Sequence, residues 1–262
     1  MRFFLAFLML LIFYLIIDRK IILSIFKPPW GFVLAALGLS ANYTGYSIGI
    51  SYTTPSNAQV FIQAGPVLLA ISGVLIFHEK ISIRQAFGYV VAIVGFYLFY
   101  SDQNENMVII NKDYFKGVLW VLFGAASWAT YAVMQKKLAK DYHPLQLNLF
   151  IFGFASLLFL PVADVNSLIG LSTNYKWLIL FLGFNTFAAY GGMALALKYA
   201  EANKVSILFT SNPIITFLVM TLLASFNVSW IEKENITIVG IIGGLLVLIG
   251  AVMVILKRKR KA

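Results

Sequence analysis

Two apolar segments carry polar side chains in a repeated helical pattern. In each, the spacing i, i+3, i+7 and i+10 places three polar groups and a proline on one face of a helix. Lipid offers no hydrogen bonds, so uncharged polar groups within a membrane segment must face protein or water. We therefore expect both faces to line an aqueous or substrate-filled space. The faces consist of Ser56, Gln59, Gln63 and Pro66, and of Asn203, Ser206, Thr210 and Pro213.

Pro66 and Pro213 interrupt otherwise continuous apolar segments. A proline removes one backbone hydrogen bond and crowds the preceding turn, so each is predicted to kink its helix and to free carbonyl groups beside the polar face. The alternative is that both prolines only shape the packing of the helices.

Further polar and aromatic side chains in other apolar segments extend this candidate pocket. Taken singly, each could instead form an interhelical hydrogen bond or belong to an interfacial aromatic belt. Taken together, they outline one polar and aromatic pocket. The candidate substrate-binding residues are Tyr43, Ser47, Gln59, Gln63, Trp128, Tyr131, Asn185, Tyr190, Ser206 and Thr210.

The amino-acid composition indicates that these segments cross a membrane. Of the 262 residues, 61% are hydrophobic and only 11% are charged, and the mean hydropathy is +0.87. A soluble domain cannot bury that much apolar surface, whereas about 20 apolar residues cross a bilayer as a helix. We expect nine transmembrane helices, at 3–17, 30–50, 57–77, 85–100, 117–135, 146–163, 177–197, 205–226 and 236–256. A signal peptide is the rival interpretation of 3–17, but Asp18 and two basic residues follow it in place of a cleavage pattern.

The basic residues are distributed unevenly between the two ends of these helices. Alternating loops place 15 Lys and Arg residues on one side and 5 on the other, which together make the 20 of the chain. The positive-inside rule then predicts a cytoplasmic C-terminus in a multi-pass protein of the cell (inner) membrane. The net charge of +10 is thereby explained without nucleic acid, and the basic tail 257–262 is a topology anchor beside the lipid bilayer. The chain has no cysteine, so disulfides and thiol chemistry are excluded.

The two halves of the sequence repeat each other. Tyr52 matches Tyr199, 147 residues later, and at the same offset Trp30 matches Trp177 and Gly45 matches Gly192. After a small insertion, Gly88 matches Gly243 and Gly95 matches Gly250, 155 residues later. Matches of Trp, Tyr and Pro in register indicate a duplication.

The duplication predicts an all-α membrane protein with an inverted 5+5 repeat. The second half has five helices, an odd number, so the halves enter the membrane in opposite senses. The first half has only four, so the bundle lacks its first helix; either the start codon lies upstream of Met1 or the chain is a natural nine-helix variant. We expect a four-helix repeat at 1–100, a connecting loop at 101–115 and a five-helix repeat at 116–256.

Glu79 and Glu234 occupy similar places after the two proline-bearing helices. Ser82 and Gln85 have the spacing of a capping box, which would place Glu79 near the positive end of a helix dipole. A structural, helix-capping role is one interpretation, and a symmetric pair of gate contacts is the other. The small-xxx-small patterns Gly45–Gly49 and Gly240–Gly244 favour close packing within the monomer over a homodimer, although both are open.

Taken together, these features resemble the EamA-like members of the drug/metabolite transporter superfamily. The stretch NAQVFIQAGPVLLAISGVLIFHEKIS, Asn57 to Ser82, carries most of the likeness. The resemblance implies a ten-helix inner-membrane bundle with alternating access and, most often, export of amino acids, other metabolites or drugs. The chain departs from the family by its missing first helix and by Asn212, where an acidic residue is frequent before the second proline. A carboxylate role in ion coupling therefore cannot be transferred to that position.

The predicted spans contain no Asp, Glu, Lys, Arg or His. This weakens a proton relay and favours a small-molecule substrate that is neutral, zwitterionic or aromatic, moved by an exporter, exchanger or facilitator. An enzyme needs a nucleophile with a base, or metal ligands; the spans show no such motif, and we expect no cofactor and no metal. The alternative function is a non-transporting or truncated inactive membrane protein.

Overall fold

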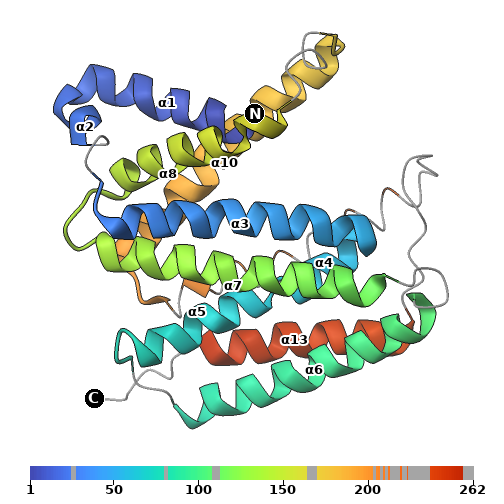
Figure 1. Cartoon of the computed structure of the whole chain (residues 1–262). Coiled ribbons are helices and arrows are strands. Elements are labelled where there is room, and N and C mark those ends of the chain that lie inside the picture. The colour runs from blue at the N-terminus through green and yellow to red at the C-terminus, as the bar shows by residue number, and fades with distance from the viewer. Residues whose placement is uncertain are drawn as a thin grey trace. The chain divides into compact units, whose positions relative to one another are not determined.

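Helices make up all the regular elements of the computed structural model, which describes residues 1–24, 28–79, 82–107, 113–163, 170–202, 205–206, 209, 212, 219, 223 and 237–255 (Figure 1). The elements are α1 (Arg2–Ile17), α2 (Arg19–Ser24), α3 (Trp30–Tyr52), α4 (Pro55–Phe61), α5 (Ala64–Leu75), α6 (Ile83–Met107), α7 (Tyr114–Leu138), α8 (Pro144–Phe159), the 3-10 helix η1 (Leu160–Val162), α10 (Thr173–Tyr199) and α13 (Ile238–Ile255).

Most predicted helices are present with boundaries within a few residues, but α6 runs to Met107, seven residues into the predicted connecting loop 101–115. Most of the helix predicted over 205–226 lies outside the described residues. Among the described residues, four helical segments are long and apolar enough to cross a membrane: Asn57–Leu75, Tyr114–Leu138, Pro144–Val162 and Thr173–Tyr199. Three shorter apolar helices, at Arg2–Ile17, Ile83–Phe99 and Ile238–Gly250, accompany them. Bundles of this kind satisfy every backbone hydrogen bond inside each helix, which is what lipid requires.

The chain divides into two compact units that do not coincide with the two sequence repeats. The first unit contains Met1–Ser40 and Thr130–Ala200, and the second contains Ala41–Ala129 and Glu201–Ala262. Each unit therefore combines helices from both halves of the sequence. The helices α3 and α7 have residues in both units.

In the first unit, α1 packs against both α8 and α10. Glycines permit the close approach: a Cβ atom at Gly183 would lie 2.6 Å from Leu5 Cβ, and one at Gly153 would lie 3.0 Å from the Phe7 ring. At the start of α3, the ring of Phe32 lies 5.6 Å from that of Phe150 in α8. The described contacts of this unit therefore join α8 both to α1 and to the first turns of α3.

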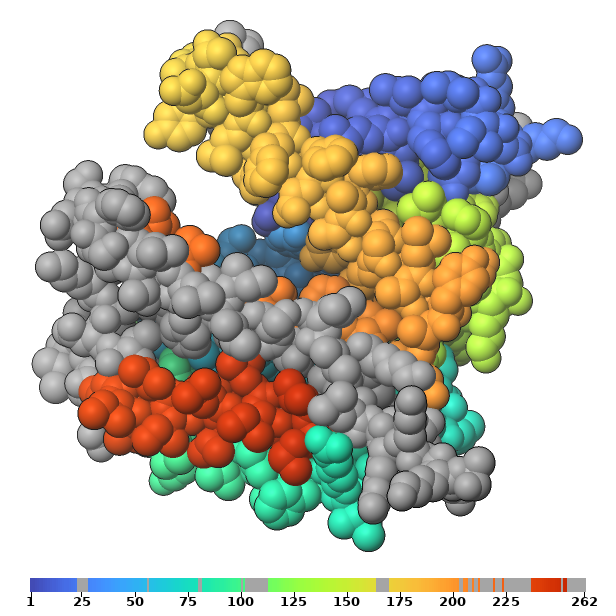
Figure 2. All heavy atoms as spheres, turned by 180° about the vertical axis from the view of Figure 1, so that it is seen from behind, coloured from blue at the N-terminus to red at the C-terminus, as the bar shows by residue number. Residues whose placement is uncertain are grey.

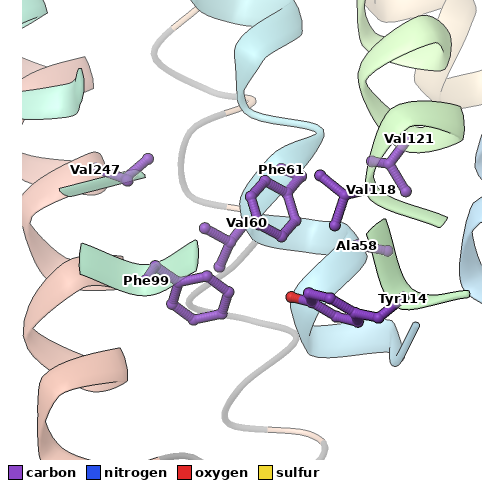
Figure 3. Packing of buried hydrophobic residues seen from close by; sticks show 8 residues of the cluster. All are labelled: Ala58, Val60, Phe61, Phe99, Tyr114, Val118, Val121 and Val247. Atoms are coloured by element: carbon purple, nitrogen blue, oxygen red, sulfur yellow. The ribbon is translucent and has the colours of Figure 1, made fainter. Parts of the chain in front are cut away.

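In the second unit, a cluster of buried apolar side chains joins α4, α6, α7 and α13 (Figure 3). Phe61 of α4 and Phe99 of α6 meet edge to face with ring centroids 5.9 Å apart. Val118 and Val121 of α7 close the cluster on one side and Val247 of α13 on the other. Aromatic pairs of this geometry add about 0.5–1.5 kcal/mol to the burial of their surface.

The contact between α3 and α7 depends on glycines. A Cβ atom at Gly45 would lie 2.8 Å from the Trp120 carbonyl oxygen and 3.0 Å from the Gly124 backbone nitrogen. One turn further, a Cβ atom at Gly49 would lie 3.0 Å from the Gly117 carbonyl oxygen. Because the neighbouring atoms belong to the backbone, they cannot move aside as a flexible side chain would. The predicted packing of the Gly45–Gly49 pattern within the monomer is therefore present.

The contact between α6 and α13 has two-fold character. Gly95 lies against Gly243, and Gly88 lies against Gly250, so the two helices run antiparallel where they cross. In the sequence repeat, however, Gly88 is equivalent to Gly243 and Gly95 to Gly250. A rotation that exchanges α6 with α13 therefore exchanges the two contacts with each other. This is the arrangement of a two-fold interface between equivalent elements.

The predicted helix over 57–77 is present as two shorter helices, α4 and α5, in agreement with the kink predicted from Pro66. It is interrupted at Ile62 and Gln63, between α4 and α5. Pro66 has no N–H group to donate to the carbonyl of Ile62, and that carbonyl accepts instead from the Gly65 amide at 2.9 Å. The short helix α2 has no counterpart among the predicted elements. The predicted capping box is present, since the Ser82 amide donates to Gln85 Oε1 at 2.8 Å and the Gln85 amide donates to Ser82 Oγ at 3.3 Å.

Gly45→Leu is expected to destabilise the protein, because the new side chain would enter the backbone of α7. Overpacking of this kind costs about 1–3 kcal/mol, which is a fall of several degrees in the melting temperature of the purified protein. Gly192→Leu is the matched control. Gly192 is the repeat equivalent of Gly45, and a Cβ atom there has nothing within 4 Å. Equal melting temperatures for the two variants would contradict the assignment of Gly45 to a backbone contact.

Candidate functional site

A buried polar cluster lies in the first unit, where α7, α8 and α10 meet. Gln135 Nε2 donates to Asn148 Oδ1 at 2.9 Å, and Asn148 Nδ2 donates to the Tyr190 carbonyl oxygen at 3.0 Å. The Tyr131 hydroxyl lies 3.5 Å from Asn148 Oδ1, and the rings of Tyr131 and Tyr190 meet edge to face at 5.8 Å. Three helices thus converge on the Asn148 amide.

This cluster retains an unused acceptor. Gln135 and Asn148 have no exposed surface, and Gln135 Oε1 has no hydrogen-bond partner within the part of the chain that the structure describes. A buried polar atom left unpaired costs about 1–3 kcal/mol, so such an atom calls for an explanation in water, ion or ligand binding. The predicted residues Tyr131 and Tyr190 lie in this cluster together with Gln135.

The interrupted helix of the second unit presents a similar feature. Gln63 lies at the break before α5 and is 2% exposed, and its Nε2 makes one long contact, 3.4 Å, with the Gln59 carbonyl oxygen. Its Oε1 has no partner among the described residues. Two residues before Gln59, the side-chain nitrogen and oxygen of Asn57 are buried and likewise without a described partner. The break in the helix thus coincides with unpaired amide groups.

Two further contacts of the second unit surround this break. Gln59 Nε2 donates to the Tyr46 hydroxyl at 2.6 Å and so joins α4 to α3. Trp128 of α7 is 8% exposed and lies against Gly65 and against Phe209, whose ring centroid is 5.0 Å away. Amide groups, a tyrosine hydroxyl and an indole can bind an uncharged or zwitterionic solute by hydrogen bonds and ring contacts.

The other predicted residues have different surroundings. Ser47 and Asn185 are exposed and Tyr43 is half-buried. On α10 the buried polar residue is Thr186, next to Asn185, and its hydroxyl donates to the Leu182 carbonyl oxygen at 2.7 Å. The Ser206 hydroxyl donates to the Ala202 carbonyl oxygen at 2.9 Å. Thr210, Pro213 and Glu234 lie outside the described residues.

Glu79 lies at the end of the turn that follows α5. His78 has a φ of 54°, a left-handed conformation that reverses the chain there, and the Glu79 amide donates to the Gly73 carbonyl oxygen at 3.0 Å. The Glu79 carboxylate accepts from the Ala202 amide at 3.4 Å. A carboxylate that accepts from a backbone amide at a helix start is stabilised by the local dipole.

Sequence reasoning missed Asn57 and Asn148, the two buried asparagines of these clusters. Asn57 lies one residue beyond Ser56, which was assigned to the polar face in its place. Asn148 lies in a largely apolar helix, and no equivalent polar residue marks it in the first repeat. A polar amide in such a helix is itself a signal, because lipid offers it no hydrogen bonds.

Metal chemistry has no support in the described part of the chain. Among those residues, no group of three or more His, Asp or Glu side chains lies together as a metal site would require. The clusters offer hydrogen-bonding groups and aromatic faces.

Comparison with known proteins identifies the family. Residues 1–101 and 115–256 match the model of the EamA-like transporter family. The chain is 28% identical over 232 residues to an uncharacterized transporter of Haemophilus influenzae, covering 88% of this chain and 76% of the relative. It is 27% identical over 227 residues to the uncharacterized inner membrane transporter YhbE of Escherichia coli K12, covering 86% and 71%.

Two further comparisons extend this result. The S-adenosylmethionine uptake transporter of Rickettsia felis is 25% identical over 132 residues, which covers 50% of this chain and 45% of the relative. A crystal structure of a protein that is 17% identical superposes with a TM-score of 0.69 and covers 99% of this chain and 86% of its own, a likeness of fold alone. Since the family model spans nearly the whole chain and the relatives are transporters, the chain belongs to the EamA-like transporter family.

Proposed function

We propose that this transporter exports or exchanges small neutral, zwitterionic or aromatic solutes by alternating access, with the solute bound near the bilayer midplane. The carrying observation is the pair of buried, unpaired amide oxygens, at Gln63 beside a helix break and at Gln135 in the α7–α8–α10 cluster. Transporters commonly bind solutes where a helix is interrupted, because the freed backbone groups become available there. The candidate residues form one group in each unit: Tyr131, Gln135, Asn148 and Tyr190 in the first, and Asn57, Gln59, Gln63 and Trp128 in the second. The other residues predicted from the sequence, Tyr43, Ser47, Asn185, Ser206 and Thr210, remain part of the proposal.

The charge of these residues restricts the substrate and the coupling. The predicted spans contain no ionisable side chain, and the buried polar residues that the structure describes there are Ser, Thr, Asn and Gln. A strongly charged solute would lack a counter-ion, and a proton would lack a carboxylate or imidazole to carry it. This favours exchange or facilitated export without proton coupling.

The inverted repeat is part of the proposal, and the α6–α13 contact supports it. Equivalent glycines of the two repeats meet in a reciprocal, antiparallel arrangement. An axis that relates antiparallel membrane helices lies in the membrane plane, as alternating access between two equivalent halves requires. Glu79 and Glu234 would then lie on opposite sides of the membrane, as helix caps or gate contacts. Because Gly45 and Gly49 are used inside the chain, they do not supply a homodimer interface.

Replacement of Gln63 by Leu should abolish transport while preserving stability. The change removes a buried, unpaired amide, and an apolar side chain of similar size is near-neutral or stabilising there. Loss of the solute hydrogen bonds should lower the transport rate at least about tenfold, equivalent to about 1.4 kcal/mol. Uptake and efflux would be measured in liposomes with and without a proton gradient, over neutral amino acids, aromatic metabolites and S-adenosylmethionine.

Asn174→Leu is the control for this experiment, because Asn174 carries the same kind of amide at an exposed position of α10. Undiminished transport by Gln63→Leu would refute the pocket assignment. Strict dependence on the proton gradient would refute the coupling assignment, and wild-type inactivity on every solute would favour the non-transporting alternative.

The proposed orientation can be tested by single cysteines, because the chain has none of its own. Lys137→Cys, at the C-terminal end of α7, should react with a membrane-impermeant maleimide only after the cells are permeabilised. Tyr175→Cys, at the start of α10, should react in intact cells. Both side chains are exposed. Labelling of Lys137→Cys in intact cells would reverse the predicted orientation.

A further inference from the structure

A basic cavity lies where α7 and α10 end, in the first unit and apart from the buried amide clusters. Its volume is about 290 Å³. The lining consists of Lys136, Ala139, Lys140, Leu197, Lys198, Tyr199 and Ala200. Ala139 and Leu197 are buried and form an apolar floor, whereas Lys140, Lys198 and Tyr199 are exposed at the mouth. The cavity thus combines three cationic groups with an apolar base.

The sequence around the cavity carries more positive than negative charge. Helix C-termini carry about half a negative charge each, so the ends of α7 and α10 together account for about one positive charge. Within 136–141 and 198–201 the sequence contains four lysines against Asp141 and Glu201, a net charge of +2. The cavity lining itself contains three lysines and no carboxylate. The cavity therefore favours an anion.

The field of Lys198 extends to a neighbouring helix start. His143, which caps α8, has its pKa lowered from the ordinary histidine value, first by burial and then by the charge of Lys198. The Lys198 Nζ atom also lies 5.8 Å from the centre of the Tyr199 ring. Lys198 is thus held over the aromatic face at the mouth of the cavity.

An apolar stripe on α10 leads away from the cavity. Phe181, Phe184, Ala188, Gly192 and Tyr199 are exposed, and their spacing of i, i+3, i+7, i+11 and i+18 places them on one helical face. Gly192 leaves open space in the middle of this face. In the view of Figure 2, the spheres of α10, gold to orange, face the viewer. In a bilayer, such a face is occupied by acyl chains or by another helix.

We propose that this cavity binds the phosphate of an anionic phospholipid, one acyl chain of which lies along the α10 stripe. Tyrosine and lysine at the end of a membrane helix lie at the level of the lipid headgroups. Basic cavities between helices on the cytoplasmic side are suited to anionic headgroups. The size of the cavity fits a headgroup better than a drug-sized molecule, for which pockets are larger. The proposal does not depend on which solute the protein transports.

The first test compares lipid binding by purified variants in a neutral detergent. Dimyristoyl phosphatidylglycerol should raise the melting temperature of the wild type more than dimyristoyl phosphatidylcholine does. Lys140→Gln and Lys198→Gln should each weaken the apparent affinity for phosphatidylglycerol about fivefold, as loss of one lysine near an anionic surface does. Lys137→Gln is the matched control, since Lys137 is exposed beside Lys136 but does not line the cavity. An equal loss in Lys137→Gln would reduce the effect to general charge and overturn the proposal.

Two soluble probes separate the lipid from a free anion. Inorganic phosphate and deacylated glycerophosphoglycerol carry the anionic group without acyl chains, and neither should reproduce the stabilisation at equal concentration. Full stabilisation by either would assign the cavity to a soluble anion and refute the lipid. Indifference of the protein to phosphatidylglycerol, as would follow if a further helix covered the α10 stripe, would also refute it.

The titration of His143 gives an independent readout that does not involve stability. The chain has two histidines, so the second, His78, serves as an internal reference in the NMR spectrum. Lys198→Gln should raise the pKa of His143, because a positive charge is removed. Bound phosphatidylglycerol should raise the pKa in the wild type for the same reason and should have less effect in Lys198→Gln. An unchanged His143 pKa on lipid binding would place the lipid elsewhere.

Discussion

Close approach of helix backbones at glycine is the constraint on which this bundle depends. Helices in lipid gain little from burying apolar surface against one another, since the acyl chains are equally apolar. Association must therefore come from dense van der Waals contact, which the small residues permit. The α3–α7 contact brings Gly45 against the backbone of Trp120 and Gly124. The α6–α13 contact brings Gly95 against Gly243 and Gly88 against Gly250. Of the candidate amides, Gln135 lies on α7, and Gln59 contacts α3 through Tyr46.

Pro66 lies close to the division between α4 and α5, where Gln63 is found. Pro66 forces the Ile62 carbonyl to accept from Gly65, and the helix is interrupted at Ile62 and Gln63. At this point the chain carries Gln63, a buried amide whose oxygen has no partner among the described residues. A buried polar group without a hydrogen-bond partner lowers the stability of the fold, and such costly features are concentrated at binding sites. The unpaired amides are therefore the residues proposed to bind the solute.

The sequence predicted the helices well because lipid imposes one strong rule on composition. The boundaries of α1 and α3 follow closely from where apolar residues begin and end, whereas α7 continues past the apolar segment to include Lys116, Lys136 and Lys137. The Ser82–Gln85 capping box follows from local hydrogen bonding alone. It was harder to predict which face of each helix is buried. Asn185 and Thr186 are adjacent, and nothing local determines that Thr186 is the buried one. The three-helix convergence on Asn148 depends on contacts between distant segments, which no spacing in the sequence encodes.

The two repeats are equivalent in sequence but not in surroundings, and this difference bears on function. Tyr52 and Tyr199 are repeat equivalents, and each has a lysine over its ring. The lysine at Tyr52 is Lys116 of α7, a helix that also covers Gly45, whereas the lysine at Tyr199 is its own neighbour, Lys198. Gly192 accordingly has open space where Gly45 has a backbone contact. Among the described residues, equivalent positions of α3 and α10 therefore differ in their contacts, although their sequences match.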